Sequence, residues 1–363
     1  MQRVNAPSTI RLASTQRGGF TLIELLVVIF IIAVLVSITV PALSSVRTSA
    51  RTTETRGLIG GLAAACQAYE LDNRNPAGYF SARDMGRQIN ETSGFSGMQN
   101  IMLDLAGGWS AEATRPNTSY FRMGPDPAQP VLSVWVNPDL IGAANATGKQ
   151  YFTPTAKNWR LINGSENGDR TSVGDNKLMP ELVDAFGTPI LAWNEDTTGP
   201  RKITQVDGFA RVNSGGQGDQ PARFYRANNA AFLASGVRVG IKAPNQDNSL
   251  LRMLLAPNVA AANLTGFLGN PASAANANDA AVALADILPS ASRGGIVLHS
   301  AGRDGVYLSQ EDKGAAVRGG GQELHYGLNF RTNANGQLTD TQGRATSTDI
   351  IGGFDDIVQG AGT

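Results

Sequence analysis

The sequence of 363 residues contains one cysteine, Cys66, and only two histidines, His299 and His325. A single cysteine excludes an intrachain disulfide, and two isolated histidines do not supply the His/Cys cluster of a zinc site. The chain also lacks a Gly-x-Ser-x-Gly elbow and a phosphate-binding loop, and its three glycines at 319–321 are interpreted as a flexible loop. These absences predict that the protein is not an enzyme.

Charge is scarce as well. Only 17% of the residues are charged, and 30 basic residues balance 30 acidic ones. A neutral chain is not expected to bind nucleic acid through phosphate contacts. Hydrophobic residues make up 42% of the sequence, which is enough for a folded core, and Cys66 is interpreted as a small buried hydrophobe.

The most apolar part of the sequence is residues 20–40, which follow a basic stretch, residues 1–19, that has no acid. About 21 helical residues span a bilayer core of roughly 30 Å, and the basic stretch is expected to stay cytoplasmic. A secretory signal peptide cleaved after the run, for instance after Ala42, is one alternative. A plain membrane anchor is another. Neither alternative explains why the run contains Glu24.

A carboxylate in a spanning helix costs on the order of 2.5–3.5 kcal/mol, so Glu24 is expected to have a partner. If the chain is cut between Gly19 and Phe20, the new amino terminus is a cation in the same apolar layer. That ammonium can neutralise Glu24 within one chain or between neighbouring chains. Neutralisation between neighbours favours one axial offset between helices, so Glu24 would set the register of a helical filament.

The stretch Gly19-Phe20-Thr21-Leu22-Ile23-Glu24, placed after a short basic leader, resembles the processing site of type IV pilins and type II secretion pseudopilins. The resemblance implies cleavage after Gly19 by a prepilin peptidase, N-methylation of Phe20 by the same enzyme, and a role for Glu24 in assembly. Pro41 lies where the spine helix of this family is often bent, and proline removes one helical hydrogen bond.

Helical periodicity continues beyond the apolar run, and one helix is predicted from Phe20 to Leu71. Its second half has an apolar stripe that needs a partner surface, most simply a sheet. The stripe consists of Ile59, Leu62, Cys66 and Tyr69. Turn formers and a proline at 72–76 are a helix stop signal.

The predicted fold class is therefore α+β and pilin-like, with a long N-terminal spine helix packed on a C-terminal antiparallel β-sheet. The predicted divisions are a cleaved leader (1–19), a transmembrane and assembly helix (20–42), the amphipathic half of the spine (43–75), an elaborated region of helices, strands and loops (76–180), and the β-sheet with its C-terminal loop (181–363).

Two later stretches also resemble major pseudopilins. Residues 184–193 (DAFGTPILAW) resemble a turn that leads into a buried strand, and residues 294–312 resemble a strand followed by a Ser-x-Gly-x-Asp-Gly loop. That loop binds calcium in the family. The resemblance implies carboxylate ligands from Asp304, Asp355 and Asp356, with carbonyls near His299 and Ser300 completing the shell. This sequence departs from the family by placing about fifty residues between Asp304 and Asp355, so either Asp312 or Asp349 substitutes as a ligand or the site is lost. The alternative is that these aspartates only form turns.

Two other features have competing interpretations. Residues 163–176 are rich in acidic and amide oxygens, but their spacing fits no twelve-residue calcium loop, so a polar surface loop is favoured. Four scattered tryptophans are interpreted as parts of the core rather than as a binding platform. They are Trp109, Trp135, Trp159 and Trp193.

The resemblance implies a structural subunit of a type II secretion pseudopilus that supports protein export. Its partners would be the prepilin peptidase and methyltransferase, other pilin-like subunits, an inner-membrane assembly platform and membrane lipid. It would cross the bacterial inner membrane once, with a cytoplasmic N-terminus and a periplasmic C-terminal domain. The alternatives are a minor pilin of a type IV pilus, for adhesion, motility or DNA uptake, and a membrane-anchored binding module that does not polymerise.

Overall fold

A computed structural model describes the fold. It describes residues 19, 21–78, 96–110, 117, 119–123, 134–144, 146, 148–161, 180–195, 199, 203, 206–211, 224–225, 249, 251, 261–270, 289, 291–309, 312, 331–332, 338–339 and 350–362. Two compact units divide between Ala50 and Arg51. The leader and the polar stretch at 163–176 lie outside the described residues, so predictions about them stay predictions.

The first element is the helix α1 (Leu22–Asn73), which confirms the predicted helix to within two residues at each end. It continues through Pro41, although proline cannot donate the backbone hydrogen bond at that position. The helix ends where Arg74 adopts a left-handed conformation (φ 58°) and donates its N–H to Glu70 O at 2.8 Å. This is a common way to terminate a helix.

In the first unit, the apolar side chains of α1 have no protein partner. Every large hydrophobic residue from Leu22 to Val46 is at least 42% exposed. In the described part of the chain, α1 is the one helix whose length and composition suit a membrane span. An apolar surface this extensive is not stable in water, so it is expected to lie in lipid or against other helices.

In the second unit, the second half of α1 buries one face against a sheet. Ile59 and Leu62 are fully buried and Cys66 is 1% exposed, while Tyr69 is partly buried at the edge of the same core. Burial stabilises each large aliphatic side chain by about 1.5–3 kcal/mol. The prediction that this stripe packs on a sheet, and that Cys66 is a buried hydrophobe, is confirmed.

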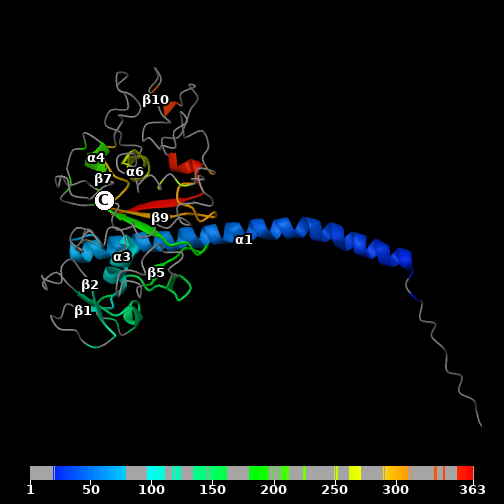
Figure 1. The fold of residues 1–363 in the computed structure, drawn as a ribbon, viewed down its shortest axis with the longest axis horizontal. Coiled ribbons are helices and arrows are strands. Elements are labelled where there is room, and N and C mark those ends of the chain that lie inside the picture. The colour runs from blue at the N-terminus through cyan, green and yellow to red at the C-terminus, as the bar shows by residue number, and fades with distance from the viewer. Residues whose placement is uncertain are drawn as a thin grey trace, which may run out of the picture. The chain divides into compact units, whose positions relative to one another are not determined.

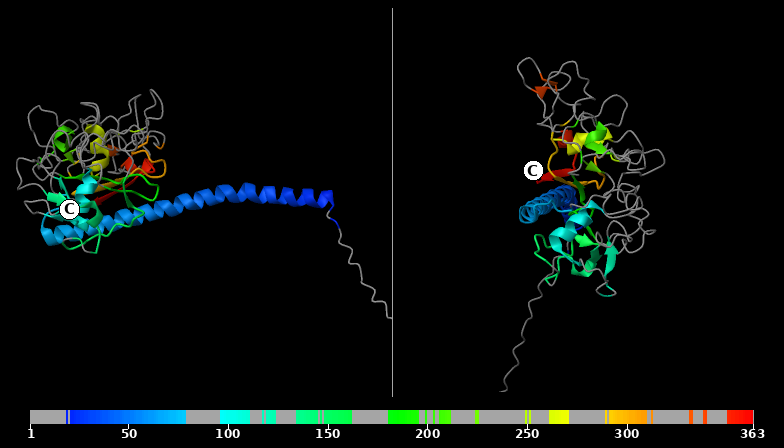
Figure 2. Two further views of the ribbon diagram at one scale, coloured as in Figure 1. Left: turned by 60° about the horizontal axis from the view of Figure 1, so that its bottom comes forward. Right: turned by 90° about the vertical axis from the view of Figure 1, so that its left-hand side faces the viewer.

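The partner sheet is antiparallel, in the order β12-β9-β6. Its strands are β6 (Leu191–Asn194), β9 (Ile296–Ser300) and β12 (Ile357–Ala361). In the central strand, Leu298 lies opposite Ala192 and Gln359, and it belongs to the core shared with α1. The views agree that α1 covers one face of this sheet and that α6 (Ala261–Leu268) covers the other (Figure 1, Figure 2). Both faces of the sheet are therefore shielded from solvent, and β9 is buried at all five positions.

The region predicted as an elaboration between helix and sheet contributes to the same core. The helix α3 (Gly97–Ala106) begins with a capping box made by Ser96 and Gln99, and nearly all its residues are buried. The described short elements around it are β1 (Trp109–Ser110), β2 (Phe121–Met123), β3 (Val134–Val136), the 3-10 helix η2 (Pro138–Leu140), β4 (Trp159–Arg160) and β5 (Glu181–Leu182). They form the antiparallel sheets β1-β3-β2 and β4-β5.

The remaining described elements are short and lie on the α6 side or near the C-terminus. They are α4 (Val206–Phe209), β7 (Ala210–Arg211), β8 (Phe224–Tyr225), β10 (Arg331–Thr332), β11 (Leu338–Thr339) and η9 (Ile350–Gly353). The pair β7-β8 is parallel, whereas β10-β11 is antiparallel. The layout is thus the α+β one predicted from the sequence, with a long N-terminal helix and a C-terminal antiparallel sheet.

The four tryptophans are distributed over four different strands. Trp193 is fully buried, and Trp109 and Trp159 pack against the core as partly buried residues. Trp135 is also partly buried. The core takes up the rings of Trp109, Trp159 and Trp193, so the interpretation as core residues is confirmed for these three, and for Trp135 it stays a prediction.

Candidate functional site

Thr21 and Glu24 form a capping box at the start of α1. The backbone N–H and the hydroxyl of Thr21 each donate to Glu24 Oε2 at 2.8 Å, and Glu24 N–H donates to Thr21 Oγ1 at 3.3 Å. Such a box satisfies backbone donors that the first helical turn leaves without partners. The sequence analysis missed it, although Thr-x-x-Glu before an apolar run is its signature.

The capping box accounts for the hydrogen bonds of Glu24 but not for its charge. Both donors from Thr21 are neutral, so they do not supply the positive charge that an ionised Glu24 requires in a segment built for lipid. Gly19 is exposed, with open space around its Cα, whereas Phe20 lies outside the described residues. Cleavage between these two residues, methylation of Phe20 and the assembly role of Glu24 therefore stay predictions.

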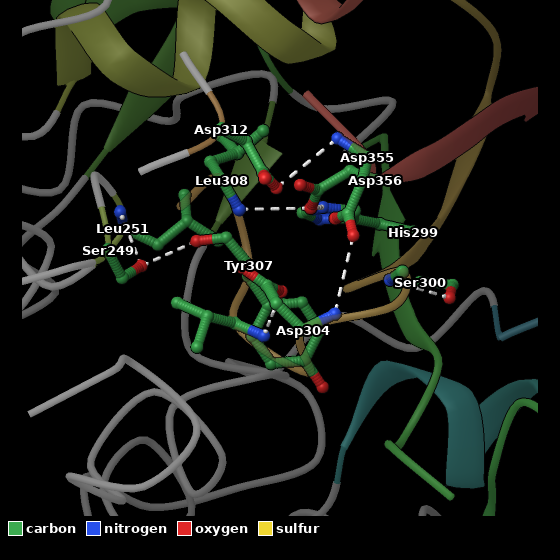
Figure 3. A network of polar contacts seen from close by, with 12 residues as sticks. Ser249, Leu251, His299, Ser300, Asp304, Tyr307, Leu308, Asp312, Asp355 and Asp356 are labelled. Atoms are coloured by element: carbon green, nitrogen blue, oxygen red, sulfur yellow. Dashed lines mark hydrogen bonds and ion pairs between the residues drawn. The ribbon is translucent and has the colours of Figure 1, made fainter. Parts of the chain in front are cut away.

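A second site lies where β9 ends and β12 begins. The carboxylates of Asp304, Asp312 and Asp355 place one oxygen each within 4.8 Å of the other two. Asp304 lies in the loop after β9, and Asp355 precedes β12 by two residues (Figure 3). Oxygen ligands from several carboxylates are the donor set that hard cations such as Ca²⁺ prefer.

Burial and neighbouring carboxyl groups raise the pKa values of two aspartates in this cluster, Asp304 and Asp355. Burial raises the pKa of Asp355 to about 7, and a hydrogen bond with Asp312 and the charges of the other aspartates add to the rise. Burial, with smaller contributions from the charges of Asp312 and Asp356, raises the pKa of Asp304 to about 6. Like charges held together in a partly buried place disfavour ionisation, and a bound cation would remove that penalty.

Backbone groups of the loop orient Asp355. Its Oδ2 accepts from the N–H of Arg303 at 2.9 Å and from that of Asp304 at 3.3 Å. Its Oδ1 is buried and has no hydrogen-bond partner in the part of the chain that the structure describes. Gly302, with a φ of 68°, allows this approach, because a Cβ there would lie 2.4 Å from Asp355 O.

Two of the residues predicted at the calcium site make other side-chain contacts. The hydroxyl of Ser300 donates to Asp184 Oδ2 at 2.6 Å, whereas the role expected for carbonyls near His299 and Ser300 stays a prediction. Asp356 Oδ1 lies 2.5 Å from His299 Nε2 and accepts from Leu308 N–H at 2.9 Å. Asp304 and Asp355 do come together, joined by Asp312, which the sequence analysis named only as a substitute. Asp349 lies outside the described residues.

The two stretches that resemble major pseudopilins contact each other. Asp184 Oδ1 accepts from the N–H groups of Phe186 at 2.8 Å and Thr188 at 2.9 Å, which confirms the predicted turn before the buried strand β6. Ser300 joins Asp184 from the end of β9, and the hydroxyl of Tyr307 donates to Pro189 O at 2.7 Å. The turn before β6 therefore supports the loop that carries Asp304.

Comparison with known proteins agrees with the first site. Residues 14–40 match the family of the prokaryotic N-terminal methylation motif. A stretch of 58 residues is 43% identical to the type II secretion system core protein G of Pseudomonas aeruginosa. This match covers 16% of the present chain and 41% of that protein, so the chain spans about two fifths of the relative's length. No solved structure matches the chain significantly.

Proposed function

We propose that the protein is a structural subunit of a pseudopilus, because its N-terminal segment matches the prokaryotic N-terminal methylation motif and is similar to a type II secretion system core protein G. In this proposal a prepilin peptidase cuts after Gly19 and methylates Phe20. The processed subunit then leaves the inner membrane to join a filament that supports protein export. The observation that carries the proposal is the methylation motif at the head of a helix whose apolar residues are exposed from Leu22 to Val46.

The chemistry of assembly follows from the contacts of Glu24. In the single subunit its carboxylate accepts two hydrogen bonds from Thr21 but meets no positive charge from that residue. Cleavage creates an ammonium at Phe20, one residue before the capping threonine. In a filament, the ammonium of one subunit neutralises Glu24 of another, because opposite charges attract strongly in a medium of low dielectric constant. This pairing selects one axial offset between neighbouring helices.

The location and partners follow from the same proposal. The exposed apolar helix anchors the protein in the membrane, with the basic residues 1–19 on the cytoplasmic side and the second unit in the periplasm. The partners are the peptidase, other pilin-like subunits, an inner-membrane assembly platform and lipid. The role is structural, not enzymatic.

Mass spectrometry of the N-terminal peptide tests this proposal. Protein purified from membranes of a cell that has a prepilin peptidase is expected to begin at Phe20 and to carry one added methyl group. Protein made without the peptidase is the control, and it should retain Gly19 and the leader. A chain that keeps its first nineteen residues in both cells would contradict the proposal, because no ammonium would then form beside Glu24.

We also propose that the acidic cluster binds Ca²⁺ through Asp304, Asp312 and Asp355. The residues fit the ion: three carboxylates converge, and the buried Oδ1 of Asp355 lacks a hydrogen-bond partner among the described residues. The ion would supply positive charge that offsets the mutual repulsion of the acids. It would fasten the loop after β9 to β12, where the sequence has no disulfide to do so.

Thermal unfolding of the full-length protein in detergent tests the calcium proposal. Calcium at 100 times its Kd stabilises the folded protein by about 2.7 kcal/mol, so the Tm should rise by several degrees over that in EGTA. Asp312→Asn should abolish most of this rise. In EGTA the variant should be as stable as the wild type or more so, because one of three like charges is gone.

The matched control is Asp139→Asn, which neutralises an exposed aspartate remote in sequence from the cluster. It should leave the calcium response unchanged. If calcium raised the Tm of Asp312→Asn as much as that of the wild type, the ion would bind elsewhere.

A further inference from the structure

His299 is buried in the middle of a sheet that is covered on both faces. It lies on the central strand β9, opposite Leu191 on one side and Val358 on the other, and its side chain has no exposed surface. Its ring packs against those of Phe267 and Tyr307, each with a centroid distance of 5.3 Å. Burying a polar ring without a hydrogen bond destabilises the folded protein. The hydrogen-bond partner of this ring is therefore expected to matter for the fold around it.

That bond goes to Asp356. The distance from His299 Nε2 to Asp356 Oδ1 is 2.5 Å, and both side chains are fully buried. If Asp356 is ionised its carboxylate can only accept, and Nε2 is then the donor to Oδ1. The same oxygen accepts from Leu308 N–H at 2.9 Å, so the histidine and the loop are held through one atom (Figure 3).

The loop after β9 has a strained backbone at Leu308, so the hydrogen bond from Leu308 to Asp356 helps to hold it in place. This residue has a φ of 47°, a left-handed conformation that costs a non-glycine residue on the order of 1–2 kcal/mol. Leu308 is also fully buried, and its N–H is satisfied by Asp356. The hydrogen bond from His299, on strand β9, holds Asp356 in the orientation that contacts Leu308.

Two adjacent aspartates then fasten both ends of one loop. Asp355 accepts from the N–H groups of Arg303 and Asp304 near the start of the loop, whereas Asp356 accepts from that of Leu308 near its end. Since Asp355 and Asp356 share a peptide bond, the orientation of one limits that of the other. Fixing Asp356 toward the sheet leaves Asp355 facing Asp304 and Asp312.

We propose that His299 is a positioning residue of the cation site: its hydrogen bond to Asp356 holds the Asp355–Asp356 pair so that Asp355, and not Asp356, faces the ion. The inference rests on the proposed calcium site and deepens it. Hydrogen-bond partners of metal ligands change metal affinity by about 10–100-fold when they are lost, and His299 acts one residue further out, through Asp356. The side chain of His299 does not touch the ion, so its effect is transmitted through the orientation of the carboxylates.

Two substitutions of His299 in the full-length protein separate its hydrogen bond from its packing. His299→Phe keeps a ring against Phe267 and Tyr307 but removes the donor. His299→Gln places an amide N–H where Nε2–H was and therefore keeps the donor. Calcium affinity is measured by calorimetric titration in detergent. Tb³⁺ luminescence decay in H₂O and D₂O, which counts the waters on the bound ion, is the second measurement.

His299→Phe is expected to weaken calcium binding about 10–100-fold and to add water to bound Tb³⁺, whereas His299→Gln should restore both values to within about threefold of the wild type. If phenylalanine does not allow folding, His299→Leu replaces it as the variant without a donor. Equal affinity in wild type and His299→Phe would overturn the inference, and so would equal losses in Phe and Gln variants. A wild type that binds no calcium would overturn the cation site itself. The mass of the N-terminal peptide would still decide the subunit proposal separately.

Discussion

Replacing Glu24 with glutamine is expected to abolish filament assembly while the protein still enters the membrane. Glutamine serves a capping box as well as glutamate does, so the amide oxygen can accept from Thr21 as Glu24 Oε2 does at 2.8 Å. The helix should therefore begin at the same residue. What glutamine removes is the negative charge, and with it the attraction to the ammonium of a neighbouring subunit.

The measurement compares filaments sheared from cells, counted by electron microscopy, with the amount of subunit in the membrane fraction. Filaments should fall below detection for Glu24→Gln, with the membrane fraction unchanged. Thr21→Ser is the control, because it keeps both the hydroxyl donor and the charge of Glu24, and it should assemble. Normal filaments from Glu24→Gln would show that the carboxylate acts only as a helix cap and that assembly does not need its charge.

Gly302→Ala is expected to destabilise the second unit by about 2–5 kcal/mol and to eliminate calcium-dependent stabilisation. The left-handed conformation at Gly302 (φ 68°) costs alanine about 1–2 kcal/mol. In addition, the new Cβ would lie 2.4 Å from Asp355 O and 2.5 Å from Asp355 Oδ1. Relief of such an overlap typically costs another 1–3 kcal/mol, and it would displace Asp355 from Asp304 and Asp312.

Gly305→Ala is a matched control in the same loop. Its φ of 74° is nearly the same, but its added Cβ would meet only the side-chain oxygen of Thr188, at 3.2 Å. It should therefore cost only about 1–2 kcal/mol and keep the calcium response. Urea unfolding in detergent, followed by tryptophan fluorescence, measures both costs. Equal costs for the two variants would mean that the close approach of Asp355 to Gly302 does not constrain the loop.

The sequence determined the features that depend on local order along the chain. The spine helix was predicted to within two residues at each end, because helical periodicity and a proline after the polar stop both act within a few residues. The same holds for the turn at 184–188 and the buried strand after it. The methylation motif is also a contiguous stretch, so its match needed no structure.

Only the tertiary structure showed which aspartate carboxylates lie close together in space. Asp355 and Asp356 are neighbours in sequence, yet one faces Asp304 and Asp312 while the other bonds to His299. That choice depends on contacts across more than forty residues, between strands and a loop whose pairing no local pattern encodes. For the same reason the sequence named Asp312 only as one of two substitute ligands. The sequence alone identifies a charged residue that interrupts an apolar helix, such as Glu24. Only the fold identifies a cluster of carboxylates that are distant in sequence.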